Sequence, residues 1–553
     1  MKKLLLLLLF IYIGQIQGQS WLWAKSGIGT GGDEGYSVAA DSSGNVYITG
    51  GFQSASVTFG NYTLTNANPG YNNIFLVKYD AFGNVLWAKS AHGSNYDFGT
   101  SVVTDNFGNV YVSGYFLSSH VIFGTDTIFN AGNNDVFLAK YDSSGNFIWV
   151  RSAGGVADDE NYSIATDIFG NIFMTGYFRS PTIIFGTDTL TNNSTNGDSD
   201  AFLAKYNTVG DVIWAKGFGG ANYDVAYSVA TDISSNVYIT GYFSSSLITF
   251  GTFTLSNTNT GHMDIFIAKY NSSGTALWAK NPNGTSDEYA YSIATDLHSN
   301  AYITGTFAGH SVDFGTHIVT NPTLTFDVFL TKYDSSGNAI WAKSAIGDIG
   351  SDIGYDVTTD ALDNVYLTGG YTSLSIAFDY DTLFYPPVTS AADPAFIFKF
   401  NSSGNVLCTS TLASGGDDNN GIAIDASGNA YFVSDFWISP FVVGSDTLKL
   451  DSLNEENIYV AKFTCSINND IKKYEKNRQI KIYPNPAQNN FTIETISADK
   501  QTVLVYDVNG KQVLAQTING TTNIDAGNFN AGVYNVSIID NAGISNKRLV
   551  IVK

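Results

Sequence analysis

One segment recurs seven times along this chain, and the recurrence limits the available folds more than any other feature of the sequence. Its marker is a Trp-Ala-Lys sequence that closes a short apolar run; the third copy reads Trp-Val-Arg and the seventh Val-Leu-Cys. The markers stand at Trp23, Trp87, Trp149, Trp214, Trp278, Trp341 and Cys408, spaced by 64, 62, 65, 64, 63 and 67 residues. Such a long period indicates supersecondary units that stack in a row or in a ring.

The second complete unit predicts four short antiparallel strands, which we letter a to d in chain order. The runs 101–105, 110–116, 135–141 and 147–151 are rich in β-branched and aromatic residues, with turn sequences between them. Between strands b and c we expect a loop of 18 residues that contains Phe-Gly-Thr-Asp-Thr. Because the strands are largely apolar on both faces, each sheet should pack between two copies of itself, as propeller blades do.

The two ends of the repeat region complement one another. A lone d strand at 21–25 opens the region, whereas strands a (421–425), b (429–435) and c (457–463) close it without a following d strand. Pairing 21–25 with 457–463 would complete a seventh sheet and remove the exposed edges that promote aggregation. The sequence therefore predicts an all-β chain, with a seven-bladed β-propeller latched by its first strand and a small β-sandwich after it.

Two recurring segments carry a family resemblance. The Asp-x-x-Gly-Asn-Val-Tyr-Ile-Thr-Gly and Asp-x-Phe-Leu-Ala-Lys-Tyr-Asp segments resemble those of the bacterial seven-bladed β-propeller repeat family, over residues 20–465. The resemblance implies the fold. It implies no activity, because members of that family mostly have no assigned chemistry.

Residues 1–18 have the pattern of a secretory signal peptide. Three residues, Met-Lys-Lys, precede an apolar run from Leu4 to Ile13, and small or polar residues follow at 17–19. The run is too short for a stable membrane anchor, and no later stretch is long enough. We expect a signal peptide at 1–18, a propeller at 19–465, a polar and basic linker at 466–479 and a C-terminal domain at 480–553, with no transmembrane anchor in the mature chain.

Charge and cysteine content exclude two further classes of protein. The net charge of −22 comes from 49 acidic and 27 basic residues, which argues against nucleic acid as a partner because phosphate binding needs a basic surface. Cys408 and Cys465 are the two cysteines, so disulfides are not the framework of the fold. The ring places the two cysteines in neighbouring units, where they could pair or remain free.

The C-terminal domain is defined by its motifs more sharply than by its fold. Strand-like runs at 503–506, 513–518 and 533–539 are separated by Asn-Gly and similar turns, which indicates a small β-sandwich. Ile-Tyr-Pro-Asn-Pro opens the domain, Ala-Gly-Val-Tyr follows in its last third, and Lys-Arg-Leu-Val-Ile-Val-Lys ends the chain. The motif residues are Tyr483, Pro484, Asn485, Pro486, Gly532, Tyr534, Lys547 and Arg548.

Together these motifs resemble the type A C-terminal sorting domain of type IX secretion cargo. The resemblance implies that the protein crosses the inner membrane of a Gram-negative cell by its signal peptide. The C-terminal domain then directs the protein across the outer membrane, with the type IX secretion machinery as its partner. The domain is usually removed, which leaves the cargo released or attached to the cell surface. Separately, we expect the mature chain to be a monomer. The alternative is an ordinary sandwich domain.

Polar residues that recur in every unit should be structural, because a catalytic or metal-binding residue needs one distinct setting. The aspartate that closes strand a precedes a turn and can bond backbone amides there. The lysine of strand c and the tryptophan of strand d should pack between blades. The aspartates are Asp41, Asp105, Asp167, Asp232, Asp296, Asp360 and Asp425; the lysines are Lys78, Lys140, Lys205, Lys269, Lys332, Lys399 and Lys462.

Function should lie in the residues that the units do not share. The b–c and d–a loops emerge on one face of the ring, and here they are the long and variable ones. Every d–a loop carries acid, so that loops crowding the axis would form an acidic rim that stays solvated or attracts cations such as calcium. These ligand-face candidates are Asp33, Glu34, Asp97, Asp158, Asp159, Glu160, Asp224, Asp287, Glu288, Asp348, Asp352, Asp417 and Asp418.

The sequence contains no catalytic signature, since its six histidines form no paired motif and no nucleophile elbow or phosphate loop is present. We expect a binding or adhesion module for protein or glycan ligands, without catalytic residues or a cofactor. The alternatives are a polysaccharide-active enzyme with its site at the axial mouth, and a structural component of the envelope or matrix. A deep axial pocket with unmatched polar residues would favour the enzyme.

Overall fold

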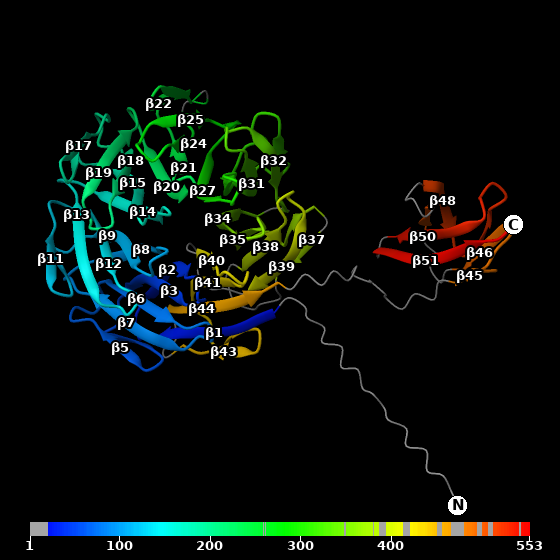
Figure 1. Cartoon of the computed structure of the whole chain (residues 1–553), viewed down its shortest axis with the longest axis horizontal. Coiled ribbons are helices and arrows are strands. Elements are labelled where there is room, and N and C mark those ends of the chain that lie inside the picture. Colours follow the sequence, from blue (N-terminus) through cyan, green and yellow to red (C-terminus); the bar gives the residue numbers. More distant parts are fainter. Residues whose placement is uncertain are drawn as a thin grey trace, which may run out of the picture. The chain divides into compact units, whose positions relative to one another are not determined.

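The computed structural model divides the chain into two compact parts, residues 1–467 and 468–553 (Figure 1). All regular elements in the described residues are β-strands, and none of those residues lies in a helix long and apolar enough to cross a membrane. The described residues are 20–257, 259, 261–347, 350–379, 381–385, 394–412, 421–450, 456–465, 481–494, 500–506, 512–540 and 543–553.

One sheet shows how a unit of the N-terminal part folds. β8 (Asp97–Thr104), β9 (Val110–Phe116), β12 (Asp135–Tyr141) and β13 (Phe147–Ala153) pair antiparallel in the order β8-β9-β12-β13. Strands b and c have the predicted bounds, but strand a begins four residues before the expected Ser101. A bulge between Gly99 and Ser101 shifts the register against β9, and this shift hid the first half of the strand from the alternation pattern.

Six further sheets in the described residues repeat this pattern. The first contains β2 (Asp33–Ala40), β3 (Val46–Phe52), β6 (Asn73–Tyr79) and β7 (Val85–Ala91). The third and fourth contain β14 (Asp159–Thr166), β15 (Ile172–Phe178), β18 (Asp200–Tyr206) and β19 (Val212–Phe218), then β20 (Asp224–Thr231), β21 (Val237–Phe243), β24 (Asp264–Tyr270) and β25 (Ala276–Lys280). The fifth and sixth contain β27 (Glu288–Thr295), β28 (Ala301–Phe307), β31 (Asp327–Tyr333) and β32 (Ala339–Ser344), then β34 (Asp352–Thr359), β35 (Val365–Tyr371), β38 (Ala395–Phe400) and β39 (Val406–Leu412).

The seventh sheet joins the two ends of the repeat region. β40 (Gly421–Ile424), β41 (Ala430–Phe436) and β44 (Asn457–Thr464) are completed by β1 (Ser20–Ile28), which lies beside β44 in Figure 1. β1 and β44 run antiparallel, with Trp21 opposite Phe463 and Lys25 opposite Val460. The predicted latch between 21–25 and 457–463 is confirmed.

The b–c segment, expected as a loop, folds into an additional hairpin. In the second unit β10 (His120–Phe123) pairs with β11 (Asp126–Phe129), and Gly124 makes the turn with a φ of 55°. Val121, Phe123 and Ile128 are buried in the core of the second sheet. The other hairpins are β4–β5 (Ser56–Phe59, Tyr62–Thr65), β16–β17 (Thr182–Phe185, Asp188–Thr191), β22–β23 (Leu247–Phe250, Phe253–Ser256), β29–β30 (Ser311–Asp313, Ile318–Thr320), β36–β37 (Ser375–Phe378, Asp381–Phe384) and β42–β43 (Phe441–Val443, Asp446–Leu448); β26 (Asn283–Gly284) and β33 (Ile346–Gly347) add short third strands to β29 and β36.

The sheets follow one another around a propeller-like ring with the a strands innermost (Figure 1). Five of the seven contacts between neighbouring sheets are made by two donors that share one acceptor. Lys78 Nζ and Trp87 Nε1 both donate to the carbonyl oxygen of Ser143 in the next unit, at 2.9 and 3.3 Å. The same sharing occurs at Ala81, Ser272, Ser335 and Ser402. The structural roles predicted for these lysines and tryptophans are confirmed.

The aspartates that close strand a hold the a–b turns. Asp105 accepts hydrogen bonds from the backbone amides of Phe107 and Asn109, from the Asn109 side chain and from the Tyr111 hydroxyl, at 2.7–3.0 Å. The equivalent aspartates from Asp41 to Asp425 bind their turns in the same way. Their predicted structural role is confirmed.

Cys408 and Cys465 form a disulfide, which resolves the alternative that the sequence left open. It ties β39 of the sixth sheet to the residue that follows β44 of the seventh. The bond therefore reinforces the ring beside the sheet that closes it.

The C-terminal part contains two small sheets that share one core. β45 (Lys481–Tyr483), β46 (Asn490–Glu494) and β49 (Thr522–Asp525) form the first; β47 (Lys500–Tyr506), β48 (Gln512–Asn519), β50 (Gly532–Asp540) and β51 (Gly543–Ile551) form the second. Phe491 and Ile493 from the first sheet are buried with Val503, Val536 and Leu549 from the second. The three predicted strands are present, and four others were missed.

Candidate functional site

A cavity of about 530 Å³ lies on the axis of the ring. Tyr36 is the fourth residue of β2 and Tyr115 the sixth of β9, so the cavity occupies the half of the axis nearer the d–a and b–c loops. Neighbouring a strands contribute successive residue pairs to its wall. The lining residues are Tyr36, Ser37, Thr100, Ser101, Tyr115, Tyr162, Ser163, Tyr227, Ser228, Tyr291, Ser292, Ile353, Tyr355, Asp356 and Gly421.

A chain of serine hydroxyl groups links the a strands around this cavity. The hydroxyl oxygen of Ser37 accepts a hydrogen bond from the Val102 amide of the next unit at 3.1 Å. The same bond recurs from Ile164 to Ser101, from Val229 to Ser163, from Ile293 to Ser228 and from Val357 to Ser292, at 3.2–3.3 Å. These serines are scaffold residues, because each one joins two neighbouring sheets.

Asp356 stands where five other units have serine. Its carboxylate accepts hydrogen bonds from the Ser292 hydroxyl at 2.6 Å and from the amides of Val357 and Ile422 at 2.8 and 2.9 Å. Burial raises the pKa of Asp356 to about 6, against the opposing effect of these hydrogen bonds. A carboxyl group that no other unit repeats therefore lies in the cavity wall.

Tyrosine rings form a continuous band around much of the cavity. Ring centroids are 5.0 Å apart between Tyr162 and Tyr227, 5.2 Å between Tyr227 and Tyr291, and 6.4 Å between Tyr291 and Tyr355. Tyr242 packs against Tyr227 at 5.7 Å from strand b of the same unit. Burial raises the pKa of Tyr162 and Tyr227 well above the ordinary value, so both hydroxyl groups remain protonated at neutral pH.

One acid from each described d–a segment lies inside the protein rather than on a rim. Asp33, Asp97, Asp159, Asp224, Glu288 and Asp352 are the first residues of their a strands and are fully buried. Five of them accept a hydrogen bond from a serine hydroxyl 21 residues further along, at 2.6–2.9 Å. Glu288 accepts one from the Ser286 amide at 3.1 Å. These carboxyl groups fix the start of strand a against the segment that follows strand b.

The remaining candidates are more exposed or lie outside the described residues. Glu34 accepts a hydrogen bond from the Tyr36 hydroxyl, and Glu160 accepts one from Tyr162 at 3.4 Å, so both face the tyrosine band. Two further acids lie near basic side chains of the loops: Asp158 lies 3.7 Å from Arg179, and Asp287 lies 3.0 Å from His262. Asp348, Asp417 and Asp418 fall outside the described residues.

We expect Asp97→Asn to weaken the pH dependence of stability. Burial raises the pKa of Asp97 to about 7 from an ordinary 3.8, although hydrogen bonds from Ser118 oppose the rise. Because the folded chain binds this proton more tightly than the unfolded chain does, stability is fullest below about pH 4 and falls as the pH rises through 7. Each unit of pKa difference corresponds to about 1.4 kcal/mol. The unfolding temperature measured at several pH values between 4 and 8 shows the effect. The same dependence of unfolding temperature on pH in Asp97→Asn and in the wild-type chain would contradict it.

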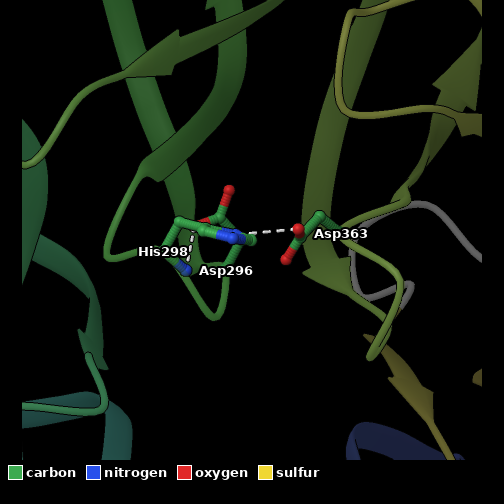
Figure 2. A group of neighbouring side chains, drawn as sticks. All are labelled: Asp296, His298 and Asp363. Carbon is green, nitrogen blue, oxygen red and sulfur yellow. Dashed lines mark hydrogen bonds and ion pairs between the residues drawn. The ribbon is translucent and has the colours of Figure 1, made fainter.

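A second cluster, Asp296, His298 and Asp363, brings three potential metal ligands together on the a–b turns of the fifth and sixth units (Figure 2). His298 Nδ1 lies 2.9 Å from Asp363 Oδ2. Asp296, however, already accepts hydrogen bonds from His298, Asn300 and Tyr302 at 2.7–3.0 Å. A metal ion would have to replace this turn-forming network, so the cluster is better described as a contact between neighbouring turns.

In the C-terminal part the opening motif binds the last strand. Asn485 Nδ2 donates to the carbonyl oxygen of Arg548 at 2.7 Å, and Asn485 Oδ1 accepts from the Val550 amide at 2.8 Å. Tyr534 is buried with its hydroxyl 2.9 Å from the Asn530 carbonyl oxygen, whereas Lys547 and Arg548 are exposed on β51. Tyr483 is also exposed, at the end of β45. Among the motif residues, Asn485 thus fixes the start of the domain to β51, whereas Lys547 and Arg548 form an exposed basic pair.

Two family models match segments of the chain. The model described as "Secretion system C-terminal sorting domain" matches residues 481–552. The model described as "Beta-propeller repeat" matches residues 11–50 and 213–242. The first match implies interaction with the type IX secretion machinery and secretion or cell-surface localisation.

Two curated proteins show partial sequence similarity. An uncharacterized WD repeat-containing protein of Acanthamoeba polyphaga mimivirus is 27% identical over 543 residues, which cover 80% of this chain and 38% of that protein. The regulatory protein FlaEY of Caulobacter vibrioides is 28% identical over 116 residues, which cover 21% of this chain and 12% of that protein. The chain thus spans well under half the length of either relative.

Solved structures show weaker likenesses. A europium-containing methanol dehydrogenase aligns over 80% of this chain and 93% of its own, with a TM-score of 0.31 and 11% identity. A gluconolactonase from Xanthomonas campestris aligns over 64% of this chain and 94% of its own, with a TM-score of 0.28 and 10% identity. Both scores are too low to bear on the activity of this chain. The two family matches, with the repeated four-stranded sheets, show a β-propeller repeat protein that carries a C-terminal sorting domain of the type IX secretion system.

Proposed function

We propose that this protein is an exported seven-bladed propeller that binds a ligand on its b–c and d–a loop face. In this proposal residues 1–18 are a signal peptide, 19–465 the propeller, 466–479 a linker and 480–553 the sorting domain that export removes. The mature propeller acts at or beyond the cell surface as a binding or adhesion module.

The axial cavity is the observation that carries the proposal. Its volume of about 530 Å³ suits a small group or the end of a chain rather than a folded partner. Tyrosine rings supply flat apolar surface, while tyrosine hydroxyl groups and Asp356 supply hydrogen-bonding partners. Sugars combine apolar ring faces with many hydroxyl groups, so we favour a glycan over a protein as the ligand.

The enzyme alternative rests on Asp356. A general acid acting near neutral pH needs a carboxyl group with a raised pKa, and that of Asp356 is raised to about 6 by burial. Glycoside hydrolysis normally needs a second carboxyl group opposite the first. Glu160, which faces the tyrosine band, is the candidate for that second group.

A glycan array probed with the purified chain tests the proposal. We expect Tyr227→Ala and Asp356→Ser each to weaken binding about tenfold, which corresponds to about 1.4 kcal/mol. Asp356→Ser restores the residue of five other units and should keep the fold. Tyr62→Ala, on an outer hairpin with its hydroxyl bonded to the Leu86 carbonyl oxygen, is the matched control and should bind normally. Absence of glycan binding would refute the proposal, and turnover of a bound glycan would favour the enzyme.

A further inference from the structure

Four of the contacts between neighbouring sheets bring two carboxyl groups together. One is the first residue of strand c, and the other is the first residue of strand a in the next unit. A backbone hydrogen bond holds the two strand ends together; the Asp159 amide, for example, donates to the Asn134 carbonyl oxygen at 2.8 Å. The pairs are Asp135 with Asp159, Asp200 with Asp224, Asp264 with Glu288, and Asp327 with Asp352.

The strand c members of these pairs have oxygen atoms without a hydrogen-bond partner. Asp135, Asp200, Asp264 and Asp327 are each at most 2% exposed. Oδ1 is unpartnered in the first three, and both carboxyl oxygens are unpartnered in Asp327. Glu288 Oε2, on the strand a side, is also buried and unpartnered. Burying a carboxylate without a partner is strongly unfavourable, so these oxygen atoms call for a positively charged ligand.

Glycines of the d–a loops lie directly against these carboxyl groups. A Cβ atom on Gly154 would lie 2.0 Å from Asp135 Oδ1, and one on Gly219 would lie 2.2 Å from Asp200 Oδ1. A Cβ atom on Gly284 would lie 1.8 Å from Glu288 Oε1. The loop backbone therefore forms a cradle that any larger residue would fill.

Two other contacts between sheets provide an internal comparison. At the equivalent positions Asn73 faces Asp97 and Asn457 faces Asp33, so each of these contacts has one carboxyl group instead of two. The asparagine oxygen accepts the loop amide, from Gly93 at 3.2 Å and from Gly29 at 3.0 Å. The fold thus forms with a single carboxyl group at this place, and a second one is not required for packing.

We propose that each of the four carboxyl pairs binds one hard divalent cation. Two carboxylates balance a charge of +2, and carboxylate, hydroxyl and backbone carbonyl oxygens are the ligands that calcium prefers. No thiol or imidazole group belongs to a pair, which disfavours zinc and other softer metals. These sites lie between sheets, away from the axial cavity, and are independent of its proposed ligand.

Calcium uptake by the full chain tests this inference. After treatment with EDTA, titration with CaCl₂ should load up to four ions per chain at pH 7.5 and raise the unfolding temperature. Asp135→Asn converts one pair to the Asn–Asp composition of the first unit, so uptake should fall from four ions to three. Asp142→Asn is the control, because Asp142 lies on an exposed turn and belongs to no pair; uptake should stay at four.

Two results would overturn the proposal. One is equal calcium uptake by Asp135→Asn and the wild-type chain, measured as bound metal after dialysis. The other is an unfolding temperature that calcium leaves unchanged while acidification from pH 8 to pH 6 raises it. That second result would mean that a shared proton, rather than a cation, balances each pair.

Discussion

A chain that lacks residues 20–28 is expected to lose its folded ring. β1 is the fourth strand of the seventh sheet, and its Trp23 and Ala24 are buried in cores that involve the first and seventh sheets. Without β1, the backbone groups along β44 lose their partners and the ring has an open edge, a structure prone to aggregation. Calorimetry should show no cooperative transition for the truncated chain under conditions in which the complete chain unfolds cooperatively.

Point variants of β1 separate the closure of the ring from general damage to the strand. Trp23→Ala should lower the free energy of unfolding by about 3–5 kcal/mol, because it leaves a cavity between sheets. Trp23 also loses its hydrogen bond to the Ala81 carbonyl oxygen. Leu22→Ala is the matched control: this neighbouring side chain is 47% exposed. Its effect should stay within about 0.5 kcal/mol, and equal losses for the two variants would contradict the role given to Trp23.

Removal of residues 480–553 should trap the protein in the periplasm and abolish its appearance in the medium or on the cell surface. The sorting domain has its own hydrophobic core and its own hydrogen bonds between Asn485 and β51. We therefore expect it to fold and to act as an export signal independently of the propeller. Cell fractionation with immunodetection of the propeller measures the result.

Two further chains sharpen the export experiment. A soluble reporter with a signal peptide and residues 480–553 at its C-terminus should be exported, because this export signal does not depend on the propeller. Asn485→Ala should reduce export by loosening the opening motif from β51. Normal secretion of the truncated propeller would refute the role assigned to the C-terminal domain.

The arrangement of the strands was largely predictable, because the repeat presents the same pattern seven times. The pairing of β1 with β44 could be predicted, because the repeat region begins with a lone strand d and ends with strands a, b and c that lack a strand d. The outer hairpins could not, since Phe-Gly-Thr-Asp-Thr is equally typical of a loop, and only packing of Phe123 into the sheet core stabilises a hairpin there. The bulge at Thr100 likewise concealed the start of strand a.

The candidate site was less predictable, because it depends on contacts between distant residues. Acids such as Asp97 were expected on an exposed rim, but Asp97 and four others are buried, each against a serine 21 residues away, a pairing that single-unit periodicity does not reveal. The tyrosines were overlooked because they recur, and recurrence favours a scaffold role. When the repeats are aligned, Asp356 is an acid at a position where five other units have serine. That it lines the axial cavity, however, follows only from the three-dimensional arrangement of the sheets.

Because the first strand closes the ring, β1 is synthesised long before its partner β44. Roughly 430 residues separate β1 from β44, and at about 5–20 residues per second the ribosome needs roughly 20–90 s to make them. Throughout that interval β1 lacks its main partner β44 and can pair only through Gly27 and Ile28 with β4, although six complete sheets lie between β1 and β44. The edge of β1 that pairs with β44 therefore stays open until the last propeller strand has been made. In refolding followed by hydrogen exchange, β1 should be among the last strands to gain protection.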